Sequence, residues 1–168
     1  MIPSVAYEES GVDVDTNRLA EALVEEEKLL TELASIFRCQ REALVRSDPE
    51  AVDESVFAAS RVAGTLTEAR RRRRILLGVV AGWEDATLRD LDDLLGAQMT
   101  MDLIEARGAL QATAADLRRE VELNRTILRR LMQDNRAHLA TLLGGTGGPG
   151  DGSGYAAAMP RRLLDREI

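Results

Sequence analysis

The residues best suited to specific polar contacts are two asparagines and one histidine within an apolar helical pattern near the C-terminus. Apolar residues recur there in steps of three and four, and this spacing keeps side chains on one side of a helix. Asn124 and Asn135 lie eleven residues apart, about three helical turns, so they point the same way. The two neighbouring seams are Leu103, Leu110, Leu117, Asn124, Leu131, His138, and Ala114, Val121, Leu128, Asn135, Leu142.

An asparagine in such a seam has two interpretations. It can hydrogen-bond a partner helix and so select that partner, or it can set the register of the protein's own coiled coil. The sequence favours neither interpretation for Asn124 and Asn135. The region is therefore predicted to be where a partner is chosen, and no catalytic chemistry follows from it.

The single histidine, His138, raises the question of phosphotransfer. A phosphorylated helical histidine needs a nearby lysine to neutralise the phosphoryl group, and the residues that follow are Leu, Ala and Thr. We therefore favour a surface histidine, and phosphotransfer is the weakest of the functions considered.

Other motifs lack the context that their chemistry needs. Residues 145–150 match the glycine spacing of a dinucleotide-binding loop, but no strand precedes them and no capped helix follows. Asp90, Asp92 and Asp93 have neither accompanying metal ligands nor calcium-loop spacing, so a solvated helix face is expected. Cys39 has no catalytic partner that the sequence identifies. No metal and no cofactor are expected.

The densest charge in the chain is the run of five arginines at 70–74. Five consecutive helical residues point all around the axis, so they form no flat basic face for nucleic acid or lipid. Pairing with acidic residues such as Glu25, Glu26 and Glu27 along a solvated helix face is favoured. The net charge of −7 and the pI near 4.9 also disfavour nucleic acid as the main ligand.

Composition indicates one all-α domain. The chain has 168 residues, only 3% of them aromatic, and none of its four prolines interrupts the three long periodic segments. One cysteine allows no internal disulfide and fits a reducing compartment. The sequence shows no secretory signal, and its most apolar run, 75–81, is too short for a bilayer. A soluble cytoplasmic protein is expected.

The periodic segments predict an antiparallel long-helix hairpin, a short helix and a longer C-terminal helix, packed as a coiled-coil-like bundle. The first helix is expected from Asp15 or Thr16 to about Arg46 and the second from Pro49 to about Ala81, with residues 47–50 as a capping box. On the second helix Val52, Val56, Ala59, Ala63 and Leu66 are expected to face inward. The seam then meets Arg70 and Arg73 before it recovers at Leu77 and Val80. Phe37 and Trp83 are expected to pack at the ends of the hairpin.

A second capping box at 87–90 should open the short helix, which ends near Leu95, and the last helix should start near Gln98. The predicted organisation is a disordered lead-in at 1–14, a helical domain at 15–143, a Gly-rich linker at 144–154 and a flexible tail at 155–168.

The expected helix lengths are unequal. The hairpin helices of ~30 residues are ~45 Å long, whereas the last helix of ~45 residues is ~68 Å long. One end of the last helix should therefore extend roughly 20 Å beyond the hairpin. An apolar stripe without an internal partner marks a binding surface or an oligomer contact.

Both the arrangement and the residues resemble the FlgN family of flagellar export chaperones over roughly residues 17–157. Residues 19–52, LAEALVEEEKLLTELASIFRCQREALVRSDPEAV, are similar to that family's first helix, with its leucine seam and central Glu pair. The last helix, ELNRTILRRLMQDNRAHLATLL, is similar through Asn124, Ile127, Leu128, Asn135, Leu139 and Leu142. The glycine-rich linker and Tyr155 resemble the family's linker and Tyr-centred tail.

The resemblance implies a cytoplasmic, non-enzymatic chaperone that holds hook-associated (hook–filament junction) proteins before flagellar export, with the export apparatus as a second partner. It also implies that the C-terminal half of the last helix and the tail bind cargo. The predicted cargo-binding residues are Asn124, Ile127, Leu128, Leu131, Asn135, Leu139, Leu142 and Tyr155. The alternative is a self-assembling scaffold coiled coil whose seam closes on a second copy, and both a monomer and a dimer are open.

Overall fold

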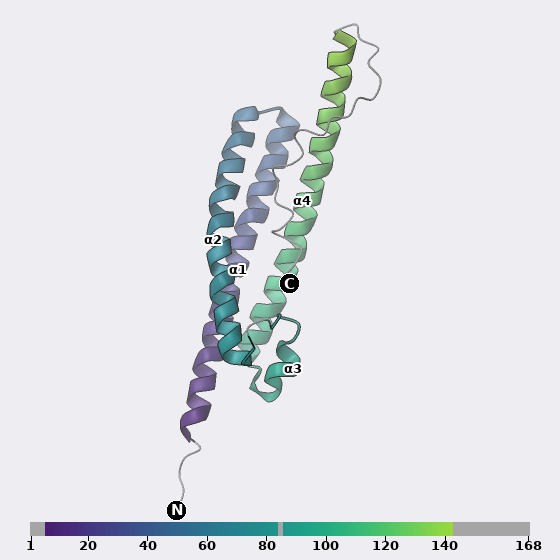
Figure 1. The fold of residues 1–168 in the computed structure, drawn as a ribbon. Helices are drawn as coiled ribbons and strands as arrows, with labels where there is room; N and C mark the ends of the chain where they lie inside the picture. The colour runs from purple at the N-terminus through teal and green to yellow at the C-terminus, as the bar shows by residue number, and fades with distance from the viewer. Residues whose placement is uncertain (1–5, 84–85, 143–168) are drawn as a thin grey trace, which may run out of the picture.

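The structure is a computed structural model that describes residues 6–83 and 86–142, with side chains from residue 14 onward. Its elements are α1 (Ala6–Arg46), α2 (Pro49–Ala81), α3 (Leu91–Leu95), the 3-10 turn η1 (Gly96–Gln98) and α4 (Met101–Leu142). Figure 1 shows the α1–α2 hairpin, α3 near its foot and α4 rising beside α1. The predicted all-α architecture is confirmed. The predicted linker and tail, 144–168, lie outside the described residues.

The first helix begins earlier than its sequence predicts. Its backbone is helical from Ala6, so the predicted start of the helix at Asp15 or Thr16 was wrong. Thr16 is fully buried within the helix and does not cap it. The physical reason is that extending an existing helix adds one hydrogen bond per residue fixed, whereas starting a new one is costly.

Asp48, rather than Ser47, caps the second helix. The Asp48 carboxylate accepts a hydrogen bond from the Ala51 amide at 3.1 Å, and Pro49 occupies the first turn. Ser47 adopts a φ of 54°, and its amide donates to the Leu44 carbonyl at 3.2 Å. The predicted capping box is therefore a tight turn in which Ser47 ends α1 and Asp48 starts α2. Such a short connection forces the two helices antiparallel.

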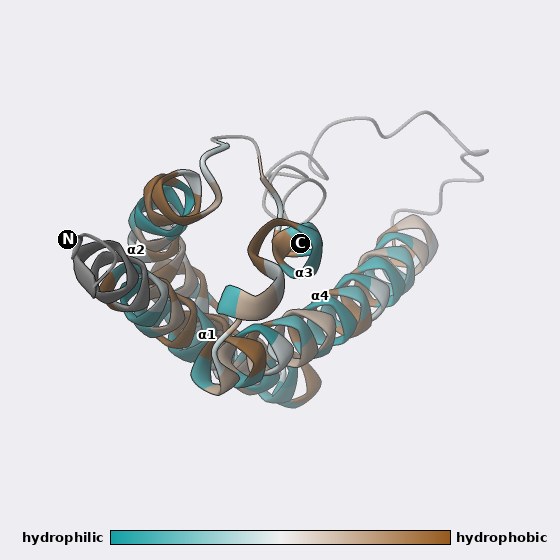
Figure 2. Cartoon of the chain, turned by 90° about the horizontal axis from the view of Figure 1, so that it is seen from below, coloured by the Kyte–Doolittle hydropathy of each residue, from teal (hydrophilic) through white to brown (hydrophobic). Residues whose placement is uncertain are grey.

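α1 is the central helix of the bundle. Seen from below in Figure 2, it lies between α2 and α4, and both of these helices pack against it. The leucine seam predicted for this helix is buried, together with a set of alanines that lets neighbouring helices approach closely. The buried apolar residues of α1 are Leu19, Ala20, Ala22, Leu23, Leu30, Leu33, Ala34, Phe37 and Ala43.

The inward face of α2 agrees only in part with the predicted one. Its buried residues are Ser55, Val62, Leu66, Ala69, Arg73 and Leu77. Of the predicted seam, Leu66, Arg73 and Leu77 are buried, and Ala59 and Val80 are partly buried against the core. Val56, by contrast, is 44% exposed. Small apolar residues occur on several sides of this helix, so the sequence pattern does not define one face. The position of α1 decides which face is covered.

The two aromatic residues expected at the hairpin ends behave differently. Phe37 is buried in the core, whereas Trp83 is 51% exposed, so its predicted packing role was wrong. Gly82, with a φ of 68°, ends α2 in the left-handed conformation. The chain leaves the helix axis at this residue, which takes Trp83 out of the seam.

The segment from residue 86 to residue 95 covers the foot of the bundle. Ala86, Leu88, Leu91 and Leu95 are buried in the shared core. The predicted contacts between Thr87 and Asp90 are present, since the Thr87 hydroxyl and amide donate to the Asp90 carboxylate at 2.7 and 2.8 Å. The hydroxyl of Thr87 is the main cause of the lowered Asp90 pKa, followed by its amide. None of the described helices combines the length and apolar character needed to cross a membrane.

Candidate protein-binding surface

α4 runs parallel to α1, and polar contacts fix the register between them. The Thr113 hydroxyl donates to Glu27 at 2.9 Å, and the Asn124 side chain donates to the Phe37 carbonyl at 2.7 Å. The partners are 86 and 87 residues apart in the chain. The last residue of α1, Arg46, is therefore level with about residue 132, almost three turns before the end of α4.

Asn124 belongs to the interface between α1 and α4. Its side chain is 3% exposed, and its amide nitrogen donates to the Phe37 carbonyl and, at 3.0 Å, to the Gln40 side chain. Gln40 is itself buried. Of the two interpretations open from the sequence, the structure therefore supports internal register-setting for Asn124. In this conformation α1 covers Asn124, so it has no surface to offer to a cargo protein.

The burial of the α4 seam ends at Asn124. Below it, the seam is buried at Leu103, Ala106, Leu110, Ala114, Leu117 and Val121. Above it, Ile127, Leu128 and Leu131 are half-buried, and every residue of 132–142 is exposed. Figure 1 shows this part of α4 rising beyond the turn between α1 and α2. The predicted extension of the last helix beyond the hairpin is confirmed. We call residues 125–142 the α4 overhang: residues 125–131 still lie beside the end of α1, and the part from about residue 132 extends beyond it.

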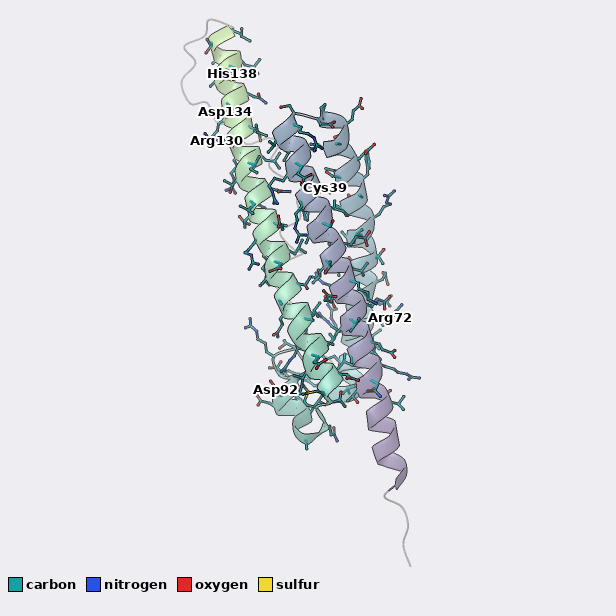
Figure 3. The ribbon with its side chains drawn as sticks, turned by 180° about the vertical axis from the view of Figure 1, so that it is seen from behind. Cys39, Arg72, Asp92, Arg130, Asp134 and His138 are labelled. Atoms are coloured by element: carbon teal, nitrogen blue, oxygen red, sulfur yellow. The ribbon has the colours of Figure 1, made fainter. Side chains whose placement is uncertain are left out.

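The overhang presents several of the predicted site residues together. Leu128, Leu131, Asn135 and Leu142 continue the spacing of the buried seam, and Leu139 lies beside them, so they share one side of the helix. Leu139 is 56% and Leu142 81% exposed. Figure 3 labels His138 on the same stretch, where it is exposed. Tyr155 lies outside the described residues.

The overhang also carries arginines that the sequence interpretation did not single out. Arg125, Arg129 and Arg136 are spaced by four and seven residues, so they lie along one flank of the apolar side. Arg125 pairs with Glu122 of its own helix. Arg129 and Arg136 are exposed and form no ion pair with any residue that the structure describes. Their helical spacing was the signal that could have identified this flank.

An ion-pair cluster ties α4 to α1 just below the overhang. Glu120 of α4 accepts a hydrogen bond from Arg38 Nε at 3.0 Å and another from Arg41. The hydrogen bond from Arg41, supported by Arg38, lowers the pKa of Glu120 although partial burial opposes the shift. The carboxylate remains ionised near neutral pH, and this cluster fixes the direction in which the overhang leaves the bundle.

The arginine run at 70–74 holds the hairpin together. Glu26, which is 1% exposed, pairs with Arg70 at 3.2 Å and with Arg73 at 3.1 Å, and Arg72 pairs with Glu25 at 2.6 Å. The predicted pairing with the acidic residues of the first helix is confirmed. The predicted solvated position is wrong for Arg73, which is buried beside the equally buried carboxylate of Glu26 and pairs with it.

The remaining candidate motifs give no chemical site. Within 6–83 and 86–142, no group of three metal-ligating side chains occurs. Asp92 binds Arg107 at 2.9 Å, which links α3 to α4, and Cys39 is an exposed free cysteine. The protein-binding surface of the overhang is therefore the main functional candidate.

Comparison with known proteins identifies the family. A family model described as FlgN protein matches residues 15–158, which include all of α2, α3 and α4 and most of α1. No curated protein and no solved structure matches the chain. The family resemblance seen in the leucine seam, the last helix and the tail is thereby confirmed. The chain belongs to the FlgN family, the cytoplasmic, non-enzymatic flagellar export chaperones for hook-associated proteins.

Proposed function

We propose that the α4 overhang is the surface on which this chaperone holds its hook-associated cargo. The observation that carries the proposal is the continuation of the α4 seam beyond the end of α1. Below that end, α1 covers the seam, whereas Leu139 and Leu142 are 56% and 81% exposed. An amphipathic helix laid along this side would repeat the contact that α1 makes lower down.

The expected occupant is a terminal amphipathic segment of the cargo. Such a helix would pack against Leu128, Leu131, Leu139 and Leu142 in the way that coiled-coil side chains interlock. Fully burying a leucine contributes roughly 1.5–3 kcal/mol, and association costs at least about 4 kcal/mol before any affinity remains. The leucines alone therefore support modest affinity, and further contacts must strengthen the complex.

Asn135 is the proposed register-setting residue for cargo. It is exposed and lies three turns beyond Asn124, which performs this role within the protein. A cargo helix that fits would satisfy the Asn135 amide, whereas a misaligned helix would bury it without partners. Asn124 acts on cargo only indirectly, by fixing the position of α4 on α1.

The tail around Tyr155 remains a predicted second contact, either with cargo or with the export apparatus. The sequence predicts a flexible glycine-rich linker at residues 144–154, and this linker would tether the tail to the helical domain. Two-point attachment of this kind raises the effective affinity of a modest primary site.

The test is co-purification with the hook-associated proteins of the same genome. We expect Leu131→Asp combined with Leu139→Asp to abolish the complex, because each aspartate would be buried against an apolar cargo helix. The far-UV helical signal should be largely retained, since Leu139 is 56% exposed and Leu131 is only half-buried. Val79→Asp on α2 is the matched control, because Val79 is 60% exposed and lies outside the overhang.

Two results would contradict this assignment of the surface. Retention of the full complex by the double aspartate variant would place cargo binding elsewhere, with the tail as the next candidate. A dimeric wild-type protein that the same variant converts to a monomer, with cargo binding intact, would favour the scaffold alternative.

A further inference from the structure

The overhang is basic in a chain that is acidic as a whole. Residues 125–142 contain four arginines and one acidic residue, Asp134, whereas the chain carries a net charge of −7. In Figure 3, Arg130 and Asp134 are labelled on this stretch of α4. The overhang therefore combines an apolar side with a local excess of positive charge, and both properties must be matched by its occupant.

The arginines are not distributed evenly around the helix. Arg129 and Arg136 lie roughly 100° from the centre of the apolar side, at its edge beside Met132 and Leu139. Arg130, by contrast, lies roughly 150° from that centre and faces away from any helix packed there. An arginine at the edge of an apolar side can lay its long stem along the contact and bring its charge to a neighbour. Arg129 and Arg136 could thus reach a cargo helix that Arg130 could not.

The lower part of α4 shows what this flank does when it has a partner. Arg107 lies about five turns before Arg125 on the same flank, and it binds Asp92 of α3 at 2.9 Å. On the opposite flank, Glu120 of α4 binds Arg38 and Arg41 of α1. Neighbours of α4 are therefore held by an apolar seam with arginine–carboxylate pairs beside it. On the overhang, Arg129 and Arg136 occupy this flank, and no described residue supplies a carboxylate that pairs with either of them.

We infer that the cargo segment held by the overhang is an acidic amphipathic helix, with carboxylates about two turns apart beside its apolar face. This inference rests on the proposed function and specifies the partner's chemistry. Arginine forms directed, bidentate pairs with carboxylates, which suits it to selecting one helix among many apolar ones. The leucines supply attraction to any amphipathic helix, and the arginine flank distinguishes acidic segments from basic ones.

The test measures the dissociation constant of the full chain for each full-length hook-associated protein of the same genome by titration calorimetry. Arg129→Glu combined with Arg136→Glu should raise the Kd by about tenfold or more, because attraction becomes repulsion at both positions. Arg130→Glu is the matched control and should change the Kd by less than about twofold, since it alters net charge without facing the cargo helix. The wild-type affinity should fall as salt rises, whereas the affinity of the double variant should rise with salt, because screening then weakens a repulsion.

A charge-exchange arm completes the experiment. Lysine in place of the carboxylates beside the cargo's apolar face should weaken binding to the wild-type chaperone and restore binding to the Arg129→Glu/Arg136→Glu variant. Equal Kd values for wild type and this variant, with the Leu131→Asp/Leu139→Asp variant still inactive, would overturn the acidic-helix inference and leave the proposed function standing. Failure of the wild-type chain to bind any hook-associated protein would overturn both.

Self-association is the remaining outcome that would overturn the inference. The acidic groove between α1 and α4, lined by Glu21, Asp102 and Glu105, is the surface on which a second copy's arginines would dock. Sedimentation of the isolated chain would then show oligomers that the Arg129→Glu/Arg136→Glu variant dissociates. A monomer in both cases leaves the cargo as the occupant.

Discussion

The two parts of α4 have the same sequence pattern and different surroundings. From Leu103 to Asn124 its seam is buried against α1, and from residue 132 to residue 142 every side chain is exposed. The helix itself is uninterrupted across this boundary. The comparison shows that the role of a seam residue depends on where the neighbouring helix ends. Asn124 lies level with Phe37, more than two turns before the end of α1, and is internal, whereas Asn135 falls beyond that end and is free for a partner.

The largest expected contrast concerns matched leucines in the two parts. Leu117→Ala should lower the free energy of unfolding by about 2–5 kcal/mol, because Leu117 is 3% exposed and its loss leaves a cavity. Leu139→Ala should change it by less than about 0.5 kcal/mol, because that side chain is largely exposed. Urea unfolding followed by circular dichroism measures both values. Comparable losses from the two substitutions in a monomeric protein would contradict the division of α4 into two parts.

A contrast of intermediate size is expected between the two asparagines. Asn124→Leu should destabilise the fold by about 1–3 kcal/mol, because the buried side-chain oxygen of Gln40 loses the hydrogen bond that the Asn124 amide donates to it. Asn135→Leu should leave the free energy of unfolding unchanged within about 0.5 kcal/mol and should loosen the discrimination between cargo helices. The measurements are urea unfolding and competition binding among hook-associated proteins.

The control for Asn124 is a double substitution. Asn124→Leu combined with Gln40→Leu removes both buried polar partners, so it should recover much of the lost stability. If Asn124→Leu alone is as stable as wild type, the hydrogen bonds to Phe37 and Gln40 contribute nothing and another contact sets the register.

Particular residues show which features the sequence could specify. The helix ends near residues 46–49 and 81–82 were predictable, because Pro49 and Gly82 have strong local preferences that tertiary contacts do not override. The overhang was predicted from unequal helix lengths, but α1 has 41 residues and α4 has 42, so the overhang exists because α4 is displaced along α1. The location of Asn124 was not, because internal and external seam positions have identical spacing. Only the register of α4 on α1, seen in the contacts of Thr113 with Glu27 and of Asn124 with Phe37, decides between them.

The charged residues also show which features the sequence could and could not specify. Pairing between the arginine run and the acidic stretch of the first helix was predictable from charge, whereas the burial of Arg73 required the positions of both helices. The inward face of α2 was predicted only in part, for the same reason. Weak amphipathic patterns leave the choice of face to packing, and strong ones such as the seam of α1 do not.

The smallest expected contrast is a pH effect confined to the contact between α1 and α4. The pKa of Glu120 is lowered in the folded state by Arg41 and Arg38, so its stabilising contribution is fully present above the unfolded-state pKa of about 4.3. That contribution is lost as pH falls through the lower, folded-state pKa. Glu120→Gln should therefore reduce the free energy of unfolding by about 1 kcal/mol at pH 7, with the difference from wild type disappearing under strongly acidic conditions.

Glu122→Gln is the control for the measurement on Glu120→Gln. Glu122 lies two residues from Glu120 on the same helix, but its side chain is 62% exposed, and among the described residues it pairs only with Arg125 of its own helix. Glu122→Gln should therefore change stability by no more than about 0.5 kcal/mol at any pH, as exposed pairs one turn apart do. A pH-dependent loss of equal size in both variants would show that general charge, rather than docking of α4 on α1, is responsible. A loss specific to Glu120 would instead place the lower boundary of the overhang at the ion-pair cluster.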